Sequence, residues 1–291
     1  MNDAQNLLNG RVAIITGASR GIGAAIAKRF VAAGARVAIV ARTLEPQEDI
    51  AGSLTEVAEA IKAAGGECCM IQADLTNPEH LAHIVNETVR QLGGVDILVN
   101  NAAWCRFPPI WEVTPKHMQL AFQMNVHTPN SLSQLVYPYL KEKGEGWILN
   151  ISSATADMPP AAPWNFDERY LRYNRDNHPT AYGASKSALE RLTVGWALEM
   201  SGSGIAVNAL APVGAVASEG AMAVGGWDAN DNLEPVEAMA EAALQLCHRP
   251  AVDCSGRVAR SIPLLRQLHV DIRNLDGSLM NKKPEDGQGG L

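Results

Sequence analysis

Short segments rich in β-branched residues alternate along this chain with longer, alanine-rich amphipathic segments. Strands joined in this way by helices are parallel, because each connection must cross back before the next strand begins. The expected strands cover residues 11–16, 36–41, 68–73, 95–100, 146–151, 205–210 and 256–262. The expected helices cover residues 22–33, 53–64, 78–91, 115–142, 181–200 and 235–247. This order predicts an α/β fold with one doubly wound, seven-stranded parallel sheet and helices on both faces.

One domain is expected, over residues 1–273, because no repeat, low-complexity block or linker divides the first 262 residues. Two stretches interrupt the alternation: residues 154–179, rich in proline and aromatic residues, and residues 213–234, rich in Gly, Ala and Met. Long irregular segments in a compact fold are commonly either functional or disordered, and we interpret residues 157–179 as an insertion and residues 213–234 as a lid. Residues 274–291 are polar and glycine-rich and are expected to form a frayed tail.

Charge and composition argue against several classes of partner. A formal net charge of -7 without any cluster of Lys or Arg argues against nucleic-acid binding. The longest apolar runs, such as VAIIT and ILVN, are too short to cross a bilayer, and the first residues do not resemble a signal peptide. The 5 cysteines and 7 histidines show no metal-ligand spacing. We therefore expect a cytoplasmic protein with a small-molecule partner and no metal.

A glycine-rich turn connects the first expected strand to the first expected helix, in RVAIITGASRGIGAAIA. Gly17, Gly21 and Gly23 would let the backbone approach a pyrophosphate, whose charge is favoured by the amide groups at the start of the helix. The turn therefore predicts dinucleotide binding.

The end of the second expected strand indicates which dinucleotide. NAD would call for a carboxylate there, to bind the ribose 2′-hydroxyl. The sequence instead has Ala41 and Arg42, and Arg20 in the glycine turn is a second guanidinium that could reach the same place. Paired guanidinium groups suit the 2′-phosphate of NADP, so NADP is favoured over NAD. The alternative is that both arginines are solvated surface cations.

Further motifs accompany this turn: NNAA at residues 100–103, Asn125, NISS at residues 150–153 and YGASK at residues 182–186. Together with TGASRGIG they resemble the classical short-chain dehydrogenase/reductase family, from about Arg11 to Ile262. The segment ARTLEPQEDIAGSLTEVAEAI is similar to hydroxysteroid dehydrogenase-like and terpenoid-alcohol dehydrogenase members. The resemblance implies a single Rossmann-type domain, commonly assembled into a homodimer or homotetramer through the long helices after strands four and five.

The resemblance also implies roles for individual residues. The implied catalytic tetrad is Asn125, Ser153, Tyr182 and Lys186. Asn100 would line the cofactor cleft, and Asp74 would meet the adenine. The residues expected to bind the cofactor are Gly17, Ser19, Arg20, Gly21, Ile22, Gly23, Arg42, Asp74, Leu75, Asn101, Ala102, Tyr182, Lys186, Pro212 and Ser218.

Tyr182 and Lys186 stand four positions apart in an expected helix and therefore face the same way. A free phenol has a pKa of about 10, so a neighbouring ammonium and an oxidised nicotinamide ring would bring the pKa of Tyr182 towards neutrality. In the implied mechanism Tyr182 exchanges a proton with the substrate oxygen, Ser153 hydrogen-bonds that oxygen, and Lys186 also holds the cofactor ribose. Asn125 would hold a helix kink and a water near Lys186, and Pro129 supports a break there.

Two serines have alternative interpretations. Ser152 competes with Ser153 for the hydroxyl role, and the family pattern favours the second serine. Ser185, inside the YGASK motif, is interpreted as a packing residue.

The long interval between Ser153 and Tyr182, 29 positions, departs from the family pattern. We therefore interpret residues 157–179 as an insertion that roofs the pocket; covering a subunit interface is the alternative. Aromatic side chains with polar tips suit a pocket lining. The aromatic residues in this segment are Trp164, Phe166, Tyr170 and Tyr173.

A second departure follows the sixth expected strand. Val213 follows Pro212, and Ala217 stands where the family usually has a threonine that contacts the nicotinamide. Ser218 is expected to substitute for that threonine, one residue later.

The leading hypothesis is an NADP-dependent oxidoreductase that interconverts an alcohol and a ketone or aldehyde. A medium-sized, largely apolar substrate is expected from the insertion and from Met222, Trp227 and Met239 near the lid, although these three could instead be core residues. The alternative function is a dinucleotide-sensing protein without catalysis, which would have no reason to retain the tetrad.

Overall fold

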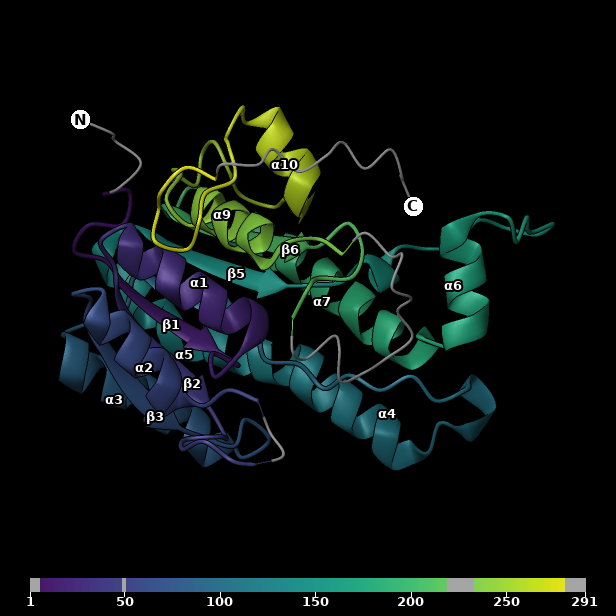
Figure 1. Ribbon diagram of the computed structural model, residues 1–291, viewed down its shortest axis with the longest axis horizontal. Coiled ribbons are helices and arrows are strands. Elements are labelled where there is room, and N and C mark those ends of the chain that lie inside the picture. Colours follow the sequence, from purple (N-terminus) through teal and green to yellow (C-terminus); the bar gives the residue numbers. More distant parts are fainter. Residues whose placement is uncertain (1–5, 49–50, 219–232, 281–291) are drawn as a thin grey trace.

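Seven strands are present in the computed structural model, which describes residues 6–48, 51–218 and 233–280. They form one sheet in the order β3-β2-β1-β4-β5-β6-β7, and each neighbouring pair is parallel (Figure 1). The strands are β1 Val12–Thr16, β2 Arg36–Ala41, β3 Cys68–Gln72, β4 Ile97–Asn100, β5 Gly146–Ile151, β6 Ile205–Ala211 and β7 Val258–Arg260. The predicted Rossmann-type α/β fold is therefore confirmed.

Helices cover both faces of this sheet (Figure 1). One face carries α1 Gly21–Ala32, α2 Leu54–Ala63 and α9 Val236–Leu246, with α10 Ser261–Gln267 packed on α9. The other face carries α3 Pro78–Leu92, α5 Thr128–Lys143 and α7 Thr180–Glu199. Side chains alternate along each strand and so reach both layers: Ala13 and Ile15 of β1 join the first core, whereas Ile14 joins the second.

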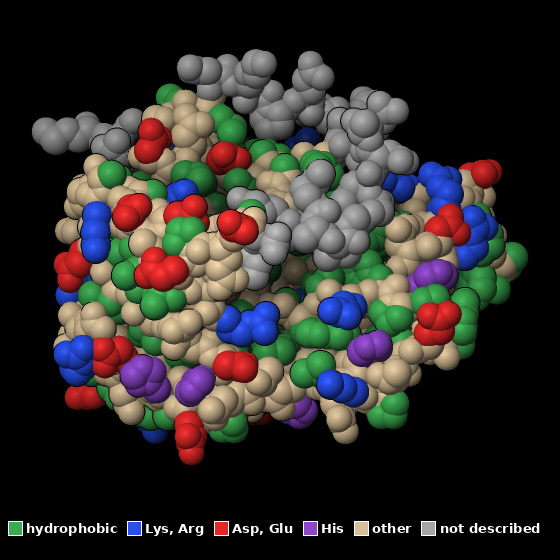
Figure 2. All heavy atoms as spheres, turned by 60° about the horizontal axis from the view of Figure 1, so that its bottom comes forward, with side chains coloured by type: hydrophobic (Ala, Val, Ile, Leu, Met, Phe, Trp, Pro, Cys, Tyr) green, Lys and Arg blue, Asp and Glu red, His purple; other side chains and the backbone are tan. Residues whose placement is uncertain are grey.

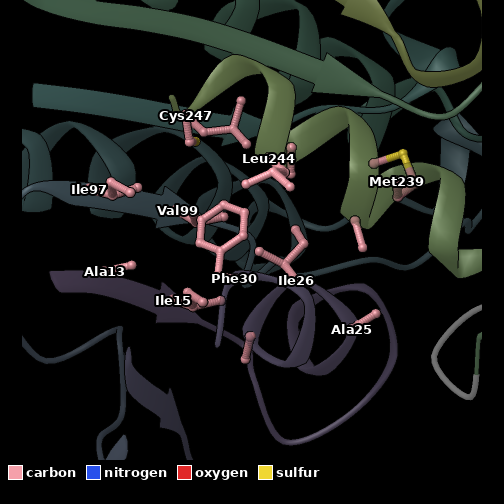
Figure 3. Close-up of a cluster of buried hydrophobic side chains, with 14 of the residues drawn as sticks. Ala13, Ile15, Ala25, Ile26, Phe30, Ile97, Val99, Met239, Leu244 and Cys247 are labelled. Carbon is pink, nitrogen blue, oxygen red and sulfur yellow. The ribbon is translucent and has the colours of Figure 1, made fainter. Parts of the chain in front are cut away.

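The first core lies between β1, β4, α1 and α9 (Figure 3). Fully buried side chains from the two helices meet there: Ile26, Phe30, Met239 and Leu244. Met239, one of the residues from which a lid over the substrate was inferred, is thus a core residue. The reason is that α9 is apolar on nearly all sides and is covered by α1, the sheet and α10.

Local signals explain where several helices begin and end. The Ser53 hydroxyl accepts a hydrogen bond from Glu56 N (3.2 Å) and donates one to the Glu56 carboxylate (2.9 Å), which closes the start of α2. Asn77 caps α3, and Gly93 ends it with a φ of 83°, which glycine adopts without strain. These signals lie in the sequence, so the expected and observed bounds of both helices nearly coincide.

One expected helix is broken. Residues 115–142 form α4 Pro115–Phe122, a π-helical turn Gln123–His127 and then α5. Pro129 has no N–H group to donate to the carbonyl of Asn125, so the regular hydrogen bonding of the helix is lost there. The kink expected at Asn125 lies within this turn.

Two further segments differ from the expectation. The last strand ends at Arg260, and the residues after it form α10, because Ser261, Leu264 and Leu265 are spaced to share the buried side of a helix and the two leucines pack into the first core. Within the expected insertion, residues 169–177 form helix α6 Arg169–Asn177. This helix is strongly polar and buries Leu171, so little apolar content marked it as a helix in the sequence.

The first residues of the expected tail are folded against α1. Arg273 and Leu279 pair in an antiparallel bridge, and Asn274 N donates to the carbonyl of Ser278 (2.9 Å). Gly277 lies beside Ala32 of α1. The expectation of a frayed tail therefore does not hold for residues 274–280, and residues 281–291 lie outside the described residues.

No helix within residues 6–48, 51–218 and 233–280 is both long and apolar enough to cross a membrane. In the same ranges no group of three or more His, Cys, Asp or Glu side chains is arranged to hold a metal ion.

Candidate active site

Many of the predicted site residues lie at the carboxyl ends of β1, β4 and β5 and on the first turns of α7; the others follow β2, β3 and β6 or lie in the π-helical turn. β1 and β4 are neighbours in the sheet, and the strand order reverses between them. A crevice forms at such a switch point, since the helices after the two strands leave on opposite faces. Figure 2 shows the surface hollowed near its middle, with hydrophobic side chains inside the hollow and Lys or Arg side chains at its border.

The glycine turn forms a tightly packed cradle. Gly17 follows β1 with a φ of 67°, and Gly21 opens α1 with a φ of 55°. A Cβ atom on Gly23 would lie 2.3 Å from the Gly17 carbonyl oxygen, so only glycine fits there. Asn101 Nδ2 donates to the carbonyl oxygens of Thr16 (2.9 Å) and Gly17 (3.2 Å) and holds the turn from the end of β4. The N-cap residue of α1, Arg20, makes no side-chain capping bond, and the N-terminus of a helix suits an anion.

The other residues expected around this cradle contribute in different ways. Thr16 Oγ1 accepts hydrogen bonds from the backbone N–H groups of Asn101 (3.0 Å) and Ala102 (3.1 Å), which ties the NNAA segment to β1. Ser19 is buried, and Ile22 packs against the first core. The side chain of Ile22 is therefore structural.

Arg20 reaches the end of β2, as expected. Its Nη2 donates to Thr43 Oγ1 at 3.2 Å, and Arg42 is exposed at the end of the same strand. A Cβ atom on Gly52 would lie 2.5 Å from the Ser19 carbonyl oxygen, so the residues after β2 fold back onto the glycine turn. Two guanidinium groups and a hydroxyl group are thus available at the end of β2.

Asp74 and Leu75 follow β3. Asp74 Oδ1 accepts hydrogen bonds from Thr76 N (2.9 Å) and Thr76 Oγ1 (2.8 Å); these bonds, and to a smaller extent the charge of Arg42, lower the pKa of Asp74. The Leu75 side chain is buried in the second core, and its carbonyl accepts a hydrogen bond from Thr128 Oγ1 (2.8 Å). The Leu75 side chain is therefore not available to a ligand.

Ser153, and not Ser152, is brought to Tyr182. Ser153 follows β5 and caps a short 3-10 turn, where its Oγ accepts hydrogen bonds from Thr155 N (3.2 Å) and Thr155 Oγ1 (2.9 Å). A side-chain hydrogen bond between Ser153 and Tyr182 acts on the pKa of Tyr182. Ser152 Oγ instead donates to Glu190 Oε1 at 2.7 Å.

Tyr182 and Lys186 lie on α7, whose first turns pack against the end of β5. A Cβ atom on Gly183 would lie 2.4 Å from the Thr155 carbonyl oxygen, so the helix and the turn after Ser153 are in direct contact. Lys186 Nζ donates to the Ile151 carbonyl oxygen at 2.7 Å and lies 5.8 Å from the centre of the Tyr182 ring. The lysine is buried.

The ionisation of this pair differs from the expectation. Burial raises the pKa of Tyr182 well above its usual value; Cys105 adds to the rise, and the Ser153 hydrogen bond opposes it. Burial lowers the pKa of Lys186 to about 8, against the opposing influence of Cys105 and Glu190. The expected lowering of the Tyr182 pKa by Lys186 is therefore wrong for the protein alone. The effect of burial on this pKa is larger than that of the Lys186 ammonium, which donates its hydrogen bond to the Ile151 carbonyl.

Asn125 joins the loop after β4 to α7. Its Nδ2 donates to the Trp104 carbonyl (3.0 Å) and to Ser185 Oγ (2.9 Å), while its Oδ1 accepts from Trp104 N (2.9 Å). Ser185 Oγ in turn donates to the Tyr182 carbonyl (2.6 Å). Ser185, interpreted from the sequence as a packing residue, is thus a hydrogen-bonding link between Asn125 and the backbone of Tyr182.

Asn100 does not face the crevice with its side chain. It is buried, and its Nδ2 donates to Asn150 Oδ1 (2.8 Å) on the neighbouring strand, with which it is in register. The expectation that Asn100 lines the cofactor cleft is therefore not met, because successive residues of an extended segment point to opposite sides and Asn101 is the one that reaches the cradle.

Three further residues lie near Tyr182: Cys105 and Phe107, which had no signal in the sequence, and Tyr173, one of the aromatic residues expected to roof the pocket. The ring centres of Phe107 and Tyr182 are 5.6 Å apart. Cys105 influences the pKa of both Tyr182 and Lys186, and Tyr173 of α6 also influences the pKa of Tyr182. Burial raises the pKa of Cys105 to about 11, so its thiol is neutral near neutral pH. Only the position of Cys105 and Phe107 shortly after NNAA could have pointed to them.

The aromatic residues of segment 157–179 do not all face the site. Tyr173 lies near Tyr182, as noted above. Trp164 is 53% exposed, and its ring centre lies 6.3 Å from that of Phe166. The Arg175 guanidinium lies over the Phe166 ring, 4.4 Å from its centre. The expectation that all of them line a pocket is therefore too broad, since Trp164 and Phe166 pack mainly with residues of their own segment.

After β6 the chain passes close to the cradle. Pro212 is buried, and Val213 N donates to Glu234 Oε2 at 2.9 Å. Ser218 and the exposed Ala217 border a cavity of about 480 Å³ that also includes Gly21 of α1. Met222 and Trp227, from which a lid was inferred, lie outside the described residues.

Comparisons with known proteins show which family the chain resembles. The family model described as short chain dehydrogenase matches residues 11–164. The chain is 32% identical over 243 residues to hydroxysteroid dehydrogenase-like protein 2 of Bos taurus, covering 84% of this chain and 54% of that protein. The chain spans about half the length of the curated relatives it matches.

Two solved structures are similar over most of the chain. A short chain dehydrogenase from Burkholderia cenocepacia J2315 in complex with NADP has a TM-score of 0.72 at 30% identity, covering 88% of this chain and 97% of that one. A 7α-hydroxysteroid dehydrogenase complexed with NADH and 7-oxo glycochenodeoxycholic acid has a TM-score of 0.73 at 29% identity, covering 89% and 96%.

Proposed function

Because the chain belongs to the short chain dehydrogenase family, we propose that it is an NADP-dependent oxidoreductase that interconverts an alcohol and a ketone or aldehyde. The observation that carries this proposal is the convergence of Ser153, Tyr182 and Lys186 at the end of β5, beside the glycine cradle. The proposed substrate is a medium-sized, largely apolar small molecule.

The residues at the switch point fit a dinucleotide. Gly23 and Gly17 pack so closely that there is no room for a side chain on Gly23, so a ligand could approach the backbone of the turn directly. The amide groups at the start of α1 suit a pyrophosphate. Arg20 and Arg42 would bind the 2′-phosphate of NADP by charge-assisted hydrogen bonds. Ala41 leaves no carboxylate at the end of β2 to bind a free 2′-hydroxyl. Since one similar structure holds NADP and another NADH, the preference for NADP is argued from these side chains.

Tyr182 is the proposed proton donor during carbonyl reduction. Burial keeps its pKa high, so the phenol is protonated near neutral pH, which is the form that an acid requires. Ser153 would hydrogen-bond the carbonyl oxygen, where negative charge develops in the transition state. The charged form of Lys186 favours the phenolate left after proton transfer.

A bound nicotinamide would supply the hydride for reduction and accept it in alcohol oxidation. In oxidation Tyr182 would take the proton from the alcohol, which requires the phenolate form. Because burial keeps the phenol protonated, the reduction is expected to be the faster direction at neutral pH.

Phe107, Cys105 and Tyr173 would form the wall against which the substrate body binds. The aromatic ring of Phe107 and the neutral thiol of Cys105 favour apolar groups. The tyrosine hydroxyl of Tyr173, whose pKa burial raises to about 12, adds a neutral polar group at this wall. This composition suits a ketone with an apolar body.

The proposal is tested by NADPH consumption with a panel of ketones and aldehydes of increasing size. Wild-type protein is expected to turn over at least one of them, and Tyr182→Phe is expected to lower kcat/KM by about 10²- to 10⁴-fold. Tyr137→Phe is the matched control, because Tyr137 lies on α5 and its ring contacts Lys141. Absence of turnover by the wild type, or full activity of Tyr182→Phe, would remove the enzyme proposal; cofactor binding without turnover would favour the sensing alternative.

The proposed assembly is a homodimer or homotetramer formed through the helices after β4 and β5, with no nucleic-acid or membrane partner. Light scattering of the purified chain checks the number of copies. A cytoplasmic location stays a prediction.

A further inference from the structure

Arg260, at the end of β7, connects two acidic residues that are far apart in the sequence. Its Nη2 pairs with Asp157 Oδ1, and its Nη1 lies 3.4 Å from Glu190 Oε1. The side chains of Arg260 and Glu190 are only 19% and 14% exposed, whereas that of Asp157 is 48% exposed. Partial burial leaves the Arg260–Glu190 pair less screened by solvent and salt than an ordinary surface pair.

Glu190 extends this connection to the candidate active site. It lies one helical turn beyond Lys186 and two turns beyond Tyr182, so all three residues share a face of α7. Its Oε1 accepts the hydrogen bond from Ser152, the residue before Ser153 (2.7 Å). Its charge also raises the pKa of Lys186 against the effect of burial. Movement of Glu190 would therefore act on both the lysine and the end of β5.

Asp157 extends the connection in the other direction, to segment 157–179. It directly follows the 3-10 turn that Ser153 caps, and its carbonyl accepts a hydrogen bond from the Tyr170 hydroxyl on α6. Tyr173, on the same helix, lies near Tyr182. The placement of α6 therefore depends on where Asp157 is held.

We propose that Arg260 is a positioning residue that couples segment 157–179 to the catalytic helix. By bridging Asp157 and Glu190, Arg260 fixes the position of segment 157–179, which carries Tyr173 of the substrate wall, relative to the Glu190 carboxylate on α7. A planar guanidinium can donate to two carboxylates at once in a fixed geometry, which a lysine ammonium at the same place does less well. The catalytic part of this inference rests on the proposed function, whereas the structural coupling does not.

Limited digestion with trypsin tests the structural coupling without any activity measurement. Segment 157–179 contains three arginines at which trypsin can cut, Arg169, Arg172 and Arg175. In Arg260→Ala the segment is expected to open more often and to be cut about tenfold faster than in the wild type. Arg257→Ala is the matched control, because its guanidinium contacts the Asp253 carbonyl at 3.5 Å, and its cleavage rate should stay at the wild-type value.

If Arg260→Ala does not fold, Asp157→Asn is used instead. This variant removes only the Arg260–Asp157 ion pair at the start of the segment and should also speed cleavage by trypsin. Circular dichroism spectra confirm that each variant is folded before digestion. Equal cleavage rates in the wild type and in the folded variants would overturn the proposal.

Kinetics test the coupling to catalysis. Arg260→Ala and Asp157→Asn are expected to raise KM for a bulky ketone by about tenfold while leaving a small ketone nearly unaffected, because only the bulky one needs the wall. Arg260→Lys should recover part of this loss. Equal losses for both ketones would contradict a positioning role. If the wild type reduces no ketone, the proposed function fails, and the digestion experiment still decides the structural coupling.

The pH profile provides an independent readout for Glu190. Among the described residues, the charged or titratable groups that act on Lys186 are Glu190 and Cys105, and the lysine lies beside the ring of Tyr182. Glu190→Gln keeps an acceptor for Ser152 but removes the charge that raises the pKa of Lys186. The loss of reductase activity at high pH is therefore expected to begin at a lower pH than in the wild type. An unchanged profile would contradict the role of Glu190.

Discussion

Tyr182 illustrates how the surroundings of a side chain can outweigh the neighbour that the sequence places beside it. The interval of four residues puts Lys186 on the same face of α7, and the structure keeps the two groups close. Both are buried, however, and burial disfavours the charged form of each group: it raises the pKa of the phenol and lowers that of the ammonium. The pair is therefore closer to neutral than spacing alone suggests.

A pH dependence follows from the lysine. Its pKa is lowered to about 8, so Lys186 is charged below that pH and neutral above it. Tyr182, whose pKa is raised, keeps its proton throughout this range. We expect kcat/KM for ketone reduction with NADPH to be level between about pH 6 and 7 and to fall as the pH rises through about 8, since only charged Lys186 favours proton release from Tyr182. A level profile up to about pH 9.5 would contradict this.

The choice of dinucleotide also depends on single side chains at the end of β2. Arg42→Asp replaces a cation with the carboxylate that would bind a ribose 2′-hydroxyl and repel a 2′-phosphate. The ratio of kcat/KM with NADPH to that with NADH is expected to fall by at least about tenfold. Arg36→Ala, at the opposite end of the same strand, is the control and should leave the ratio unchanged. Preference of the wild type for NADH would overturn the interpretation of Arg20 and Arg42.

Among the helices, α1 and α9 show how a packed pair can enclose charge. Arg29 Nε donates to Glu241 Oε2 at 2.8 Å, and the two side chains are 0% and 1% exposed. Glu241 Oε1 also accepts a hydrogen bond from Gln245 (3.1 Å). In the part of the chain that the structure describes, Arg29 Nη1 and Nη2 have no hydrogen-bond partner. The pair is thus buried but incompletely satisfied, so it contributes less to stability than its short distance suggests.

This pair leads to a prediction for stability. Glu241→Ala removes the carboxylate that is paired with the buried Arg29 guanidinium and is expected to lower the free energy of unfolding by about 3–5 kcal/mol. The double replacement Arg29→Met with Glu241→Leu removes both charges and is expected to be about neutral or stabilising. Urea denaturation measures both. A loss below about 1 kcal/mol in Glu241→Ala would indicate that water reaches the guanidinium.

The protein as a whole places its candidate site where the two halves of the sheet meet. Residues from the ends of β1, β4 and β5 come together there because parallel strands all finish at the same edge. The cradle needs Gly17 and Gly23 from the first part of the chain and Asn101 from the end of β4. Cofactor binding to this crevice should therefore stabilise the fold across both halves.

That linkage can be measured. At a concentration about 100 times its Kd, NADPH is expected to raise the free energy of unfolding by about 2.7 kcal/mol, and NADH at the same concentration by less. Gly23→Ala should lose this stabilisation, because its Cβ atom would lie 2.3 Å from the Gly17 carbonyl oxygen and deform the cradle. Thermal unfolding with and without each dinucleotide is the measurement. Equal stabilisation of the wild type and Gly23→Ala by NADPH would contradict the assigned cradle.

Much of the fold could be predicted from the sequence because its signals are local. Strand and helix periodicity, the Ser53 and Asn77 caps and the glycine turn act within a few residues, and the structure contains all seven expected strands. The misjudged elements, α6 and α10, are short and depend on contacts with distant residues for their stability. The order of the family's motifs likewise singled out Ser153, Tyr182 and Lys186, which the structure brings together, and their catalytic roles stay a prediction.

The amino-acid order alone dictated which groups stand on one face of α7 and which backbone can approach a phosphate, because both follow from the geometry of neighbouring residues. Only the tertiary structure decided how those groups ionise and what surrounds them. Cys105 and Phe107 come from the loop after β4, and Arg260 comes from the end of β7 and contacts Glu190. Burial, which sets the pKa of Tyr182, is a property of everything packed around it.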